Sequence, residues 1–164
     1  MGVSIAAAAM ILVSCSSSTT PTELVVNCGM FPTLAPGDRV EVGPPGRLQR
    51  GDIVFYVTPD GAATSPRPGR VVGLPGEQLR TAGGSVFIDG SVINESYLPP
   101  PGGATPASDV PATIVPDGDV FIFGDNRAAS VDSRFFGPVS QMSIRSRLLR
   151  VPDHQNEPAT CTNG

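Results

Sequence analysis

Residues 85–93 have the sequence Ser85-Val86-Phe87-Ile88-Asp89-Gly90-Ser91-Val92-Ile93. Two runs of β-forming residues flank an Asp-Gly pair. This arrangement is typical of a β-hairpin with a type I′ turn, because both central residues of that turn need a positive φ. Further runs of β-forming residues, bounded by turn residues, occur at 38–42, 53–57, 70–72 and 119–123. The sequence therefore predicts a domain of short β-strands joined by turns.

The composition supports the same fold class. The chain has 164 residues, of which 19 are glycine and 18 are proline, and 40% are hydrophobic while 16% are charged. Each interior Gly or Pro costs a helix ~1 or ~3 kcal/mol relative to Ala, so we expect no long helices. A disordered chain would have few apolar residues and a high net charge. We expect a single mostly β domain with a long Pro/Gly-rich surface loop over residues 99–116 and no internal repeats.

The charged residues exclude several functions. The formal net charge is −4, and all 11 cationic side chains are arginine because the chain contains no lysine. Nucleic-acid binding is not expected, since it needs a basic surface. No Cys/His cluster predicts a metal site, and no Gly-rich loop joins a strand to a helix, so we expect no metal and no phosphate-containing cofactor.

The N-terminus has the pattern of an export signal. The apolar run Ile5–Val13 is shorter than the ~20 residues that span a membrane, but it suits the apolar core of a signal peptide. The following Leu12-Val13-Ser14-Cys15 resembles a bacterial lipobox, whose cysteine is lipidated. We therefore expect a signal peptide over residues 1–14 and a lipidated Cys15 followed by a flexible tether over 15–26. The alternative is an ordinary signal peptide with an incidental cysteine, which would make the protein secreted.

Two of the three cysteines remain if Cys15 carries lipid. Export places Cys28 and Cys161 in an oxidising compartment, where such a pair usually forms a disulfide. This bond would attach the C-terminal tail, residues 152–164, to the start of the folded domain. A free thiol at Cys28 is the alternative.

Four segments of the chain, in order, resemble the conserved boxes of the type I signal peptidases, the serine peptidases of family S26. The first contains Met30, Pro32 and Thr33, and the last contains Gly124, Asp125 and Asn126. The segments are Gly29-Met30-Phe31-Pro32-Thr33-Leu34 with the following Pro36-Gly37-Asp38-Arg39-Val40, then Arg50-Gly51-Asp52-Ile53-Val54, then Arg70-Val71-Val72-Gly73-Leu74-Pro75-Gly76-Glu77, and finally Gly124-Asp125-Asn126-Arg127 with Ser130, Asp132-Ser133-Arg134 and Gly137.

The resemblance implies a signal-peptidase-like domain over residues 27–151, built from antiparallel β-sheets with a hairpin insertion. Such enzymes act on the outer side of the cytoplasmic membrane and cut preproteins after an Ala-x-Ala-like sequence. Their chemistry uses a serine nucleophile and an unprotonated lysine as base.

The two residues that would carry this chemistry are missing. The nucleophile position is Gly29 and the base position is Gly69, and glycine has no side chain to attack or to accept a proton. Some members of the family use histidine as base, but the one histidine, His154, lies in the tail. Arginine cannot replace lysine, because its pKa keeps it protonated in proteins.

Other residues of the family's site are retained. Ser130 matches a serine that supports the lysine, and Asp132 and Arg134 match a pair that braces the site. Without a lysine, we expect these three to hold a turn through hydrogen bonds and an ion pair. Asn27 matches a position where some members place an oxyanion-hole side chain, which makes it a candidate amide donor.

These observations predict a catalytically inactive homologue that keeps a groove for extended peptide or preprotein segments and is anchored to the membrane through its N-terminal lipid. A second hypothesis is a working peptidase with another nucleophile, Cys28 or Ser130, together with His154. A third is a structural lipoprotein of the cell envelope whose groove is closed.

Overall fold

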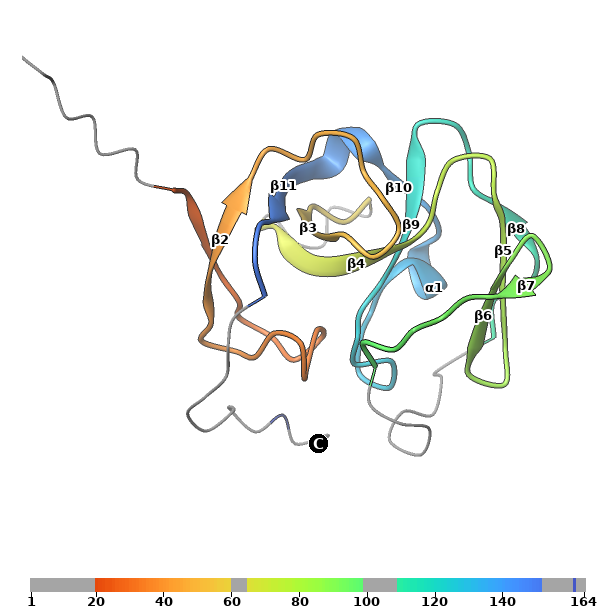
Figure 1. Ribbon diagram of the computed structural model, residues 1–164, viewed down its shortest axis with the longest axis horizontal. Helices are drawn as coiled ribbons and strands as arrows, with labels where there is room; N and C mark the ends of the chain where they lie inside the picture. The colour runs from red at the N-terminus through yellow and green to blue at the C-terminus, as the bar shows by residue number, and fades with distance from the viewer. Residues whose placement is uncertain (1–19, 60–64, 99–108, 152–160, 162–164) are drawn as a thin grey trace, which may run out of the picture.

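The computed structural model describes residues 20–59, 65–98, 109–151 and 161. The expected signal peptide, Cys15 and His154 therefore lie outside the described residues. The chain forms a seven-stranded sheet of order β1-β2-β11-β3-β4-β9-β10 and a four-stranded sheet of order β7-β6-β5-β8, both antiparallel throughout. Figure 1 shows the two sheets side by side.

The helices and strands are short. They are β1 (Thr22–Leu24), β2 (Arg39–Gly43), β3 (Ile53–Tyr56), β4 (Arg67–Gly73), β5 (Gln78–Ala82), β6 (Ser85–Ile88), β7 (Ser91–Val92), β8 (Thr113–Ile114), β9 (Asp119–Phe123), α1 (Ser133–Phe136), β10 (Val139–Ser140), the 3-10 helix η1 (Gln141–Ser143) and β11 (Ile144–Leu148). The predicted mostly β fold of antiparallel sheets is confirmed. Within the described ranges, no helix has the length and hydrophobicity needed to cross a membrane.

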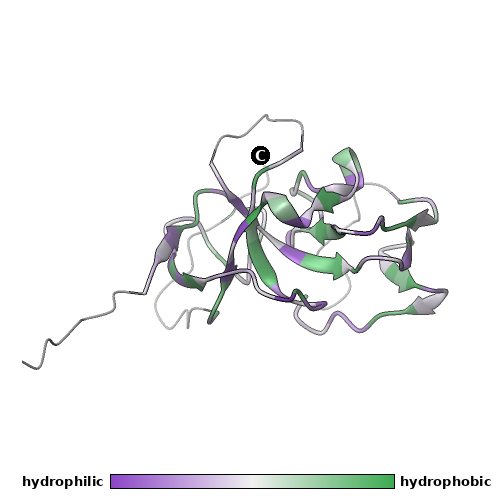
Figure 2. Cartoon of the chain, turned by 90° about the horizontal axis from the view of Figure 1, so that it is seen from above, coloured by the Kyte–Doolittle hydropathy of each residue, from purple (hydrophilic) through white to green (hydrophobic). Residues whose placement is uncertain are grey.

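The central strands of the large sheet are covered on both faces, which explains their uninterrupted apolar sequences. Successive side chains of a strand point to opposite faces. In β9, Val120 and Ile122 accordingly join one buried cluster, whereas Phe121 and Phe123 join another, which lies against the small sheet. Strands β3 and β4 divide their residues between clusters in the same way. Figure 2 shows hydrophobic residues along the strands of both sheets.

The small sheet is an excursion of the chain between two neighbouring strands of the large sheet. Strand β4 leads through the turn at 74–77 into β5, and β8 leads back into β9, which pairs with β4. The predicted hairpin forms β6 and β7 within this excursion. Its turn residues Asp89 and Gly90 have φ values of 49° and 82°, so the positive φ expected at both positions is confirmed.

Three sequence-based expectations are corrected by the structure. The tether expected over residues 15–26 ends earlier, because Thr22–Leu24 pairs with β2 as β1 and Val25 is fully buried. Strand β5 has no uniform apolar run and was not predicted; it forms because β6 and β8 pair with it on either side. The loop expected over 99–116 contains β8, and Val110 and Val115 next to it are buried in the core.

Gly73 is tightly packed between β9 and residues of the small sheet, and this yields a prediction about stability. A Cβ at Gly73 would lie 2.9 Å from Phe121 Cβ and 3.1 Å from Leu79 Cδ1, both on packed strands. We expect Gly73→Ala to lower the free energy of unfolding by about 1–3 kcal/mol, because neither neighbour can withdraw without repacking the core.

Gly43→Ala is the matched control for this substitution. Its Cβ would meet the Cδ2 atom of Leu149 at 3.0 Å, but that side chain is half exposed and can rotate away. Urea unfolding of both variants measures the difference. Equal losses of stability would contradict the close packing at Gly73.

Candidate functional site

The predicted site begins at a turn over residues 28–34. Met30 and Leu34 are fully buried and anchor the turn in the core. The side-chain amide of Asn126 donates to the Cys28 carbonyl (3.1 Å), and its backbone amide donates to the Gly29 carbonyl (3.0 Å). The first and last boxes of the resemblance are therefore in direct contact, although Cys28 and Asn126 are 98 residues apart.

The absence of a side chain at Gly124 allows this contact. A Cβ at Gly124 would lie 2.2 Å from the hydroxyl oxygen of Ser130 and 2.4 Å from the carbonyl oxygen of Gly29. Any other residue would separate the two segments. A Cβ at Gly29 would in turn lie 3.6 Å from the Ser130 hydroxyl. The structure thus brings the Ser130 hydroxyl close to Gly29, the expected nucleophile position, whereas the resemblance assigned Ser130 to the support of the base position at Gly69.

Asn27 contacts the same position in a different way from that expected. Its side-chain oxygen Oδ1 accepts a hydrogen bond from the Gly29 backbone amide (2.9 Å). A Cβ at Gly29 would lie 3.1 Å from this oxygen. The side-chain oxygen of Asn27 therefore faces Gly29, and the backbone donor of Gly29 is engaged within the protein, while the role of Asn27 as an oxyanion donor stays a prediction.

Gly69 lies in β4, and other side chains occupy the space in front of it. A Cβ at Gly69 would lie 2.5 Å from Ile122 Cγ2 and 3.0 Å from Tyr56 Cε1. Both residues belong to the buried cluster on that face of the large sheet. A β-branched side chain such as Ile122 has restricted rotamers, so it cannot easily move aside. A side chain at position 69 would need this part of the core to repack.

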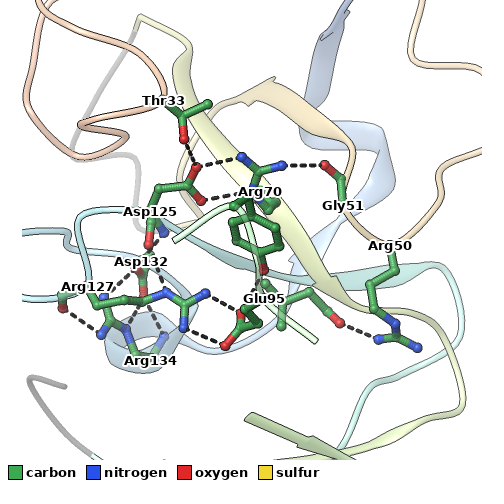
Figure 3. Close-up of polar contacts among 12 residues, drawn as sticks. Thr33, Arg50, Gly51, Arg70, Glu95, Asp125, Arg127, Asp132 and Arg134 are labelled. Atoms are coloured by element: carbon green, nitrogen blue, oxygen red, sulfur yellow. Dashed lines mark hydrogen bonds and ion pairs between the residues drawn. The ribbon is translucent and has the colours of Figure 1, made fainter. Parts of the chain in front are cut away.

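Asp125 joins the turn to the large sheet through a buried ion pair. Arg70 donates to both of its carboxylate oxygens, from Nε to Oδ1 (2.8 Å) and from Nη2 to Oδ2 (2.6 Å), and from Nη1 to the Gly51 carbonyl (2.9 Å). The Thr33 hydroxyl donates to Asp125 Oδ2. Figure 3 shows Asp125 between Thr33 and Arg70. The paired geometry satisfies the charges of both buried groups.

A second group of polar residues covers Arg70 from the segment after β7. Glu95 accepts hydrogen bonds from both terminal nitrogens of Arg127 and from the Tyr97 hydroxyl, and the guanidinium carbon of Arg70 lies 3.9 Å from the centre of the Tyr97 ring. Burial, followed by the hydrogen bond to Glu95, raises the pKa of Tyr97 well above its ordinary value. Burial would lower the pKa of Arg127, but the hydrogen bonds and charge of Glu95 outweigh it, so the pKa is raised. Both groups therefore remain protonated at neutral pH.

Asp132 and Arg134 brace the loop that carries Ser130. Arg134 donates to both oxygens of Asp132 at 2.8 Å, and it also donates to the Arg127 carbonyl (2.7 Å). The Gly124 amide donates to Asp132 Oδ2 (2.9 Å). The retained pair therefore holds a turn, in the arrangement that the sequence led us to expect.

Cys28 forms a disulfide with Cys161, with 5.8 Å between the two Cα atoms. Its sulfur is therefore not available as a nucleophile, which corrects the hypothesis of a peptidase that uses Cys28. The segment after Cys28 is a turn. Among the parts of the chain that the structure describes, no three His, Cys, Asp or Glu side chains are grouped to hold a metal ion.

Comparison with known proteins places the fold and these motifs in one family. The family described as "Signal peptidase, peptidase S26" matches residues 1–151. The chain is 37% identical over 136 residues to "Probable signal peptidase I-1" of Synechocystis sp. and 34% identical over 134 residues to "Signal peptidase I" of Leptolyngbya laminosa, each alignment covering 73% of this chain. The chain belongs to the S26 signal peptidase family.

A solved structure agrees with this assignment. The crystal structure of a signal peptidase I from Enterococcus faecalis superposes with a TM-score of 0.51 at 30% sequence identity, covering 61% of this chain and 95% of the other. The alignments span 64% of the Synechocystis relative and 62% of the Leptolyngbya relative, so this chain matches less than two thirds of their length.

The Arg70–Asp125 pair leads to a second prediction about stability. We expect Arg70→Gln to lower the free energy of unfolding by about 3–5 kcal/mol, because it leaves the Asp125 carboxylate buried without its cation. The matched control is Arg147→Gln, which removes a partly exposed pair with Asp52 (3.4 Å) and should cost at most about 1 kcal/mol. Urea unfolding at neutral pH compares them, and similar losses would contradict the assigned role of the buried pair.

Proposed function

We propose that this protein is a signal-peptidase-like protein that has lost peptidase activity and binds extended peptide segments beside the Gly29 turn. The relatives are named signal peptidases, and the fold and the boxes around the site are shared with them. The observation that carries the proposal is the pair of glycines at positions 29 and 69, with packed side chains in front of the second.

The arrangement around Gly69 supports loss of the base. Ile122 and Tyr56 occupy the space that any side chain at position 69 would need. Nucleophile and base act as a unit, and removal of one already abolishes most of the rate enhancement in enzymes of this kind. The loss of both therefore leaves no route to acyl transfer through these positions.

Contacts of the neighbouring groups also support the proposal. The oxyanion in acyl transfer is stabilised by donors that point at it. Here the Gly29 amide already donates to Asn27 Oδ1, and the Cys28 sulfur is bonded to Cys161. Ser130 has a hydroxyl at the site, but no lysine exists in the chain to accept its proton.

The edge of the large sheet supports peptide binding by strand addition. Strand β1 pairs with β2 along one side, and it leads directly into the Gly29 turn. The Val25 amide donates to the Asp38 carbonyl, so in this antiparallel register the amides of Leu24 and Val26 point to the open side. Leu24 and Val26 are exposed. An extended peptide can form main-chain hydrogen bonds along this edge.

The N-terminal sequence completes the proposal. A lipid on Cys15 would hold the domain at the outer face of the cell membrane, where exported preproteins emerge. The mass of the mature N-terminus tests this assignment, since lipidation and cleavage before Cys15 both change it by known amounts.

The first test of the proposed function measures cleavage and binding with the same peptide. We expect the purified protein to leave an Ala-x-Ala-containing preprotein peptide intact while it binds the peptide in a fluorescence anisotropy assay. Binding should weaken strongly when the peptide backbone is N-methylated, because strand addition needs its amide donors. A signal peptidase I serves as the positive control for cleavage.

Protein variants locate the binding edge. Val26→Pro removes the outward-pointing amide two residues beyond β1 and should abolish binding. Val92→Pro is the matched control, because Val92 is an equally exposed valine at the open side of the other sheet, in its edge strand β7. Cleavage at the Ala-x-Ala site by the unmodified protein would refute the proposed loss of activity. Equal effects of the two proline variants would refute binding along β1.

A second test asks whether packing has closed the base pocket. We expect the double variant Gly29→Ser with Gly69→Lys to remain inactive and to lose about 1–3 kcal/mol of stability, because the new side chain at 69 collides with Ile122. Adding Ile122→Ala should restore part of that stability, since it removes the colliding Cγ2 atom. Thermal unfolding and peptide cleavage are measured on the double variant and on the triple variant with Ile122→Ala. A double variant that is as stable as the unmodified protein and cleaves peptide would contradict the closed pocket.

A further inference from the structure

A cavity of about 380 Å³ lies away from the Gly29 site, where the loop before β3, the turn at 74–77, the start of β9 and the start of η1 meet. Val120 in this cavity lies near the start of β9 and Gly124 at the site directly follows its end, and four residues of extended strand separate them by roughly 13 Å. The cavity is large enough for a small ligand, since ligand pockets commonly measure 300–1,000 Å³.

The floor of the cavity is apolar. Leu48 and Val120 are buried members of the same core cluster, and Leu74 packs against it. Val120 is fully buried and Leu48 nearly so, so the apolar surface that a ligand would remove from water is that of Leu74 and Pro75, which also line the cavity.

The rim of the cavity carries an uncompensated positive charge. Glu77 is neutralised, because Arg50 pairs with its Oε1 oxygen and the Leu74 amide donates to its Oε2 oxygen (2.7 Å). Arg47 also lines the cavity, and none of the ion pairs between described residues includes it. The charge at the opening therefore favours an anionic group on the ligand.

The walls of the cavity are held in place by hydrogen bonds. The Gly76 amide donates to the Val115 carbonyl (2.8 Å), and the Gln141 amide donates to the Gly118 carbonyl (2.9 Å). Because these segments are already ordered, a ligand does not have to order them on binding.

We propose that this cavity binds a carboxylate attached to an apolar group, with the apolar group on Leu74 and Pro75 and the carboxylate at Arg47. A free small acid and the C-terminal residue of a peptide share this chemistry. This site is independent of the proposed function at Gly29, since none of its residues contributes to that site.

The test compares a carboxylate with its neutral analogue. N-acetyl-leucine and N-acetyl-leucinamide differ only in the charged group. We expect the protein to bind the acid about fivefold more tightly at low ionic strength, because a factor of this size corresponds to the energy of one exposed ion pair. Arg47→Gln should reduce this ratio to about one. Arg145→Gln, which removes an exposed arginine from β11, should leave it unchanged.

NMR chemical-shift changes locate the binding, and they should be largest at the amides of Leu74, Glu77 and Gln141.

A peptide identifies the source of the carboxylate. Tighter binding of Ac-Ala-Ala-Leu with a free C-terminus than of N-acetyl-leucine would identify the C-terminus of a peptide as the ligand, and equal binding would identify a free acid. The proposal would be overturned if the chemical shifts of the Leu74, Glu77 and Gln141 amides stayed unchanged up to about 10 mM ligand, a concentration above the dissociation constants of specific binding. An unchanged acid-to-amide ratio in Arg47→Gln would also overturn it.

Discussion

The carboxylate of Asp125 is the contact on which the rest of the site depends. It accepts hydrogen bonds from Thr33 in the Gly29 turn and from Arg70 in β4, and it follows the end of β9. Three distant parts of the chain therefore meet at one charged group. Because an unpaired buried charge is far more costly than a paired one, these segments are held in a single arrangement. The turn that contains Gly29 is thereby held against β4 and the end of β9.

Packed side chains fill the space in front of Gly69. Removing a long side chain from a core would leave a cavity, and cavities are destabilising in proportion to their volume. Here Ile122 and Tyr56 pack directly against the Gly69 backbone. The braces that surround the site, Asp132 with Arg134 and Glu95 with Arg127, remain in place. These ion pairs have a structural role that does not require catalysis, which is consistent with the binding role we propose.

Two surfaces of the domain suit two different kinds of ligand. The edge of β1 offers main-chain donors and exposed apolar side chains next to the Gly29 turn, which suits an extended peptide. The cavity at Arg47 is partly open and has an apolar floor beside one arginine that forms no ion pair with a described residue, which suits a small anionic group. The two surfaces are formed by different segments of the chain, so occupation of one leaves the other accessible.

Local patterns in the sequence were sufficient to predict much of this fold. The hairpin at Asp89-Gly90 and the strands around Phe55 and Ile122 follow from turn chemistry and apolar runs, which act between near neighbours. The glycines at 29 and 69 are likewise visible in the sequence alone. Only the tertiary structure shows that Ile122 fills the space before Gly69, that Asn27 accepts from Gly29, and that Arg70 pairs with Asp125 across 55 residues. Such contacts depend on strand register and on the packing of side chains from distant segments, and no local pattern carries that information.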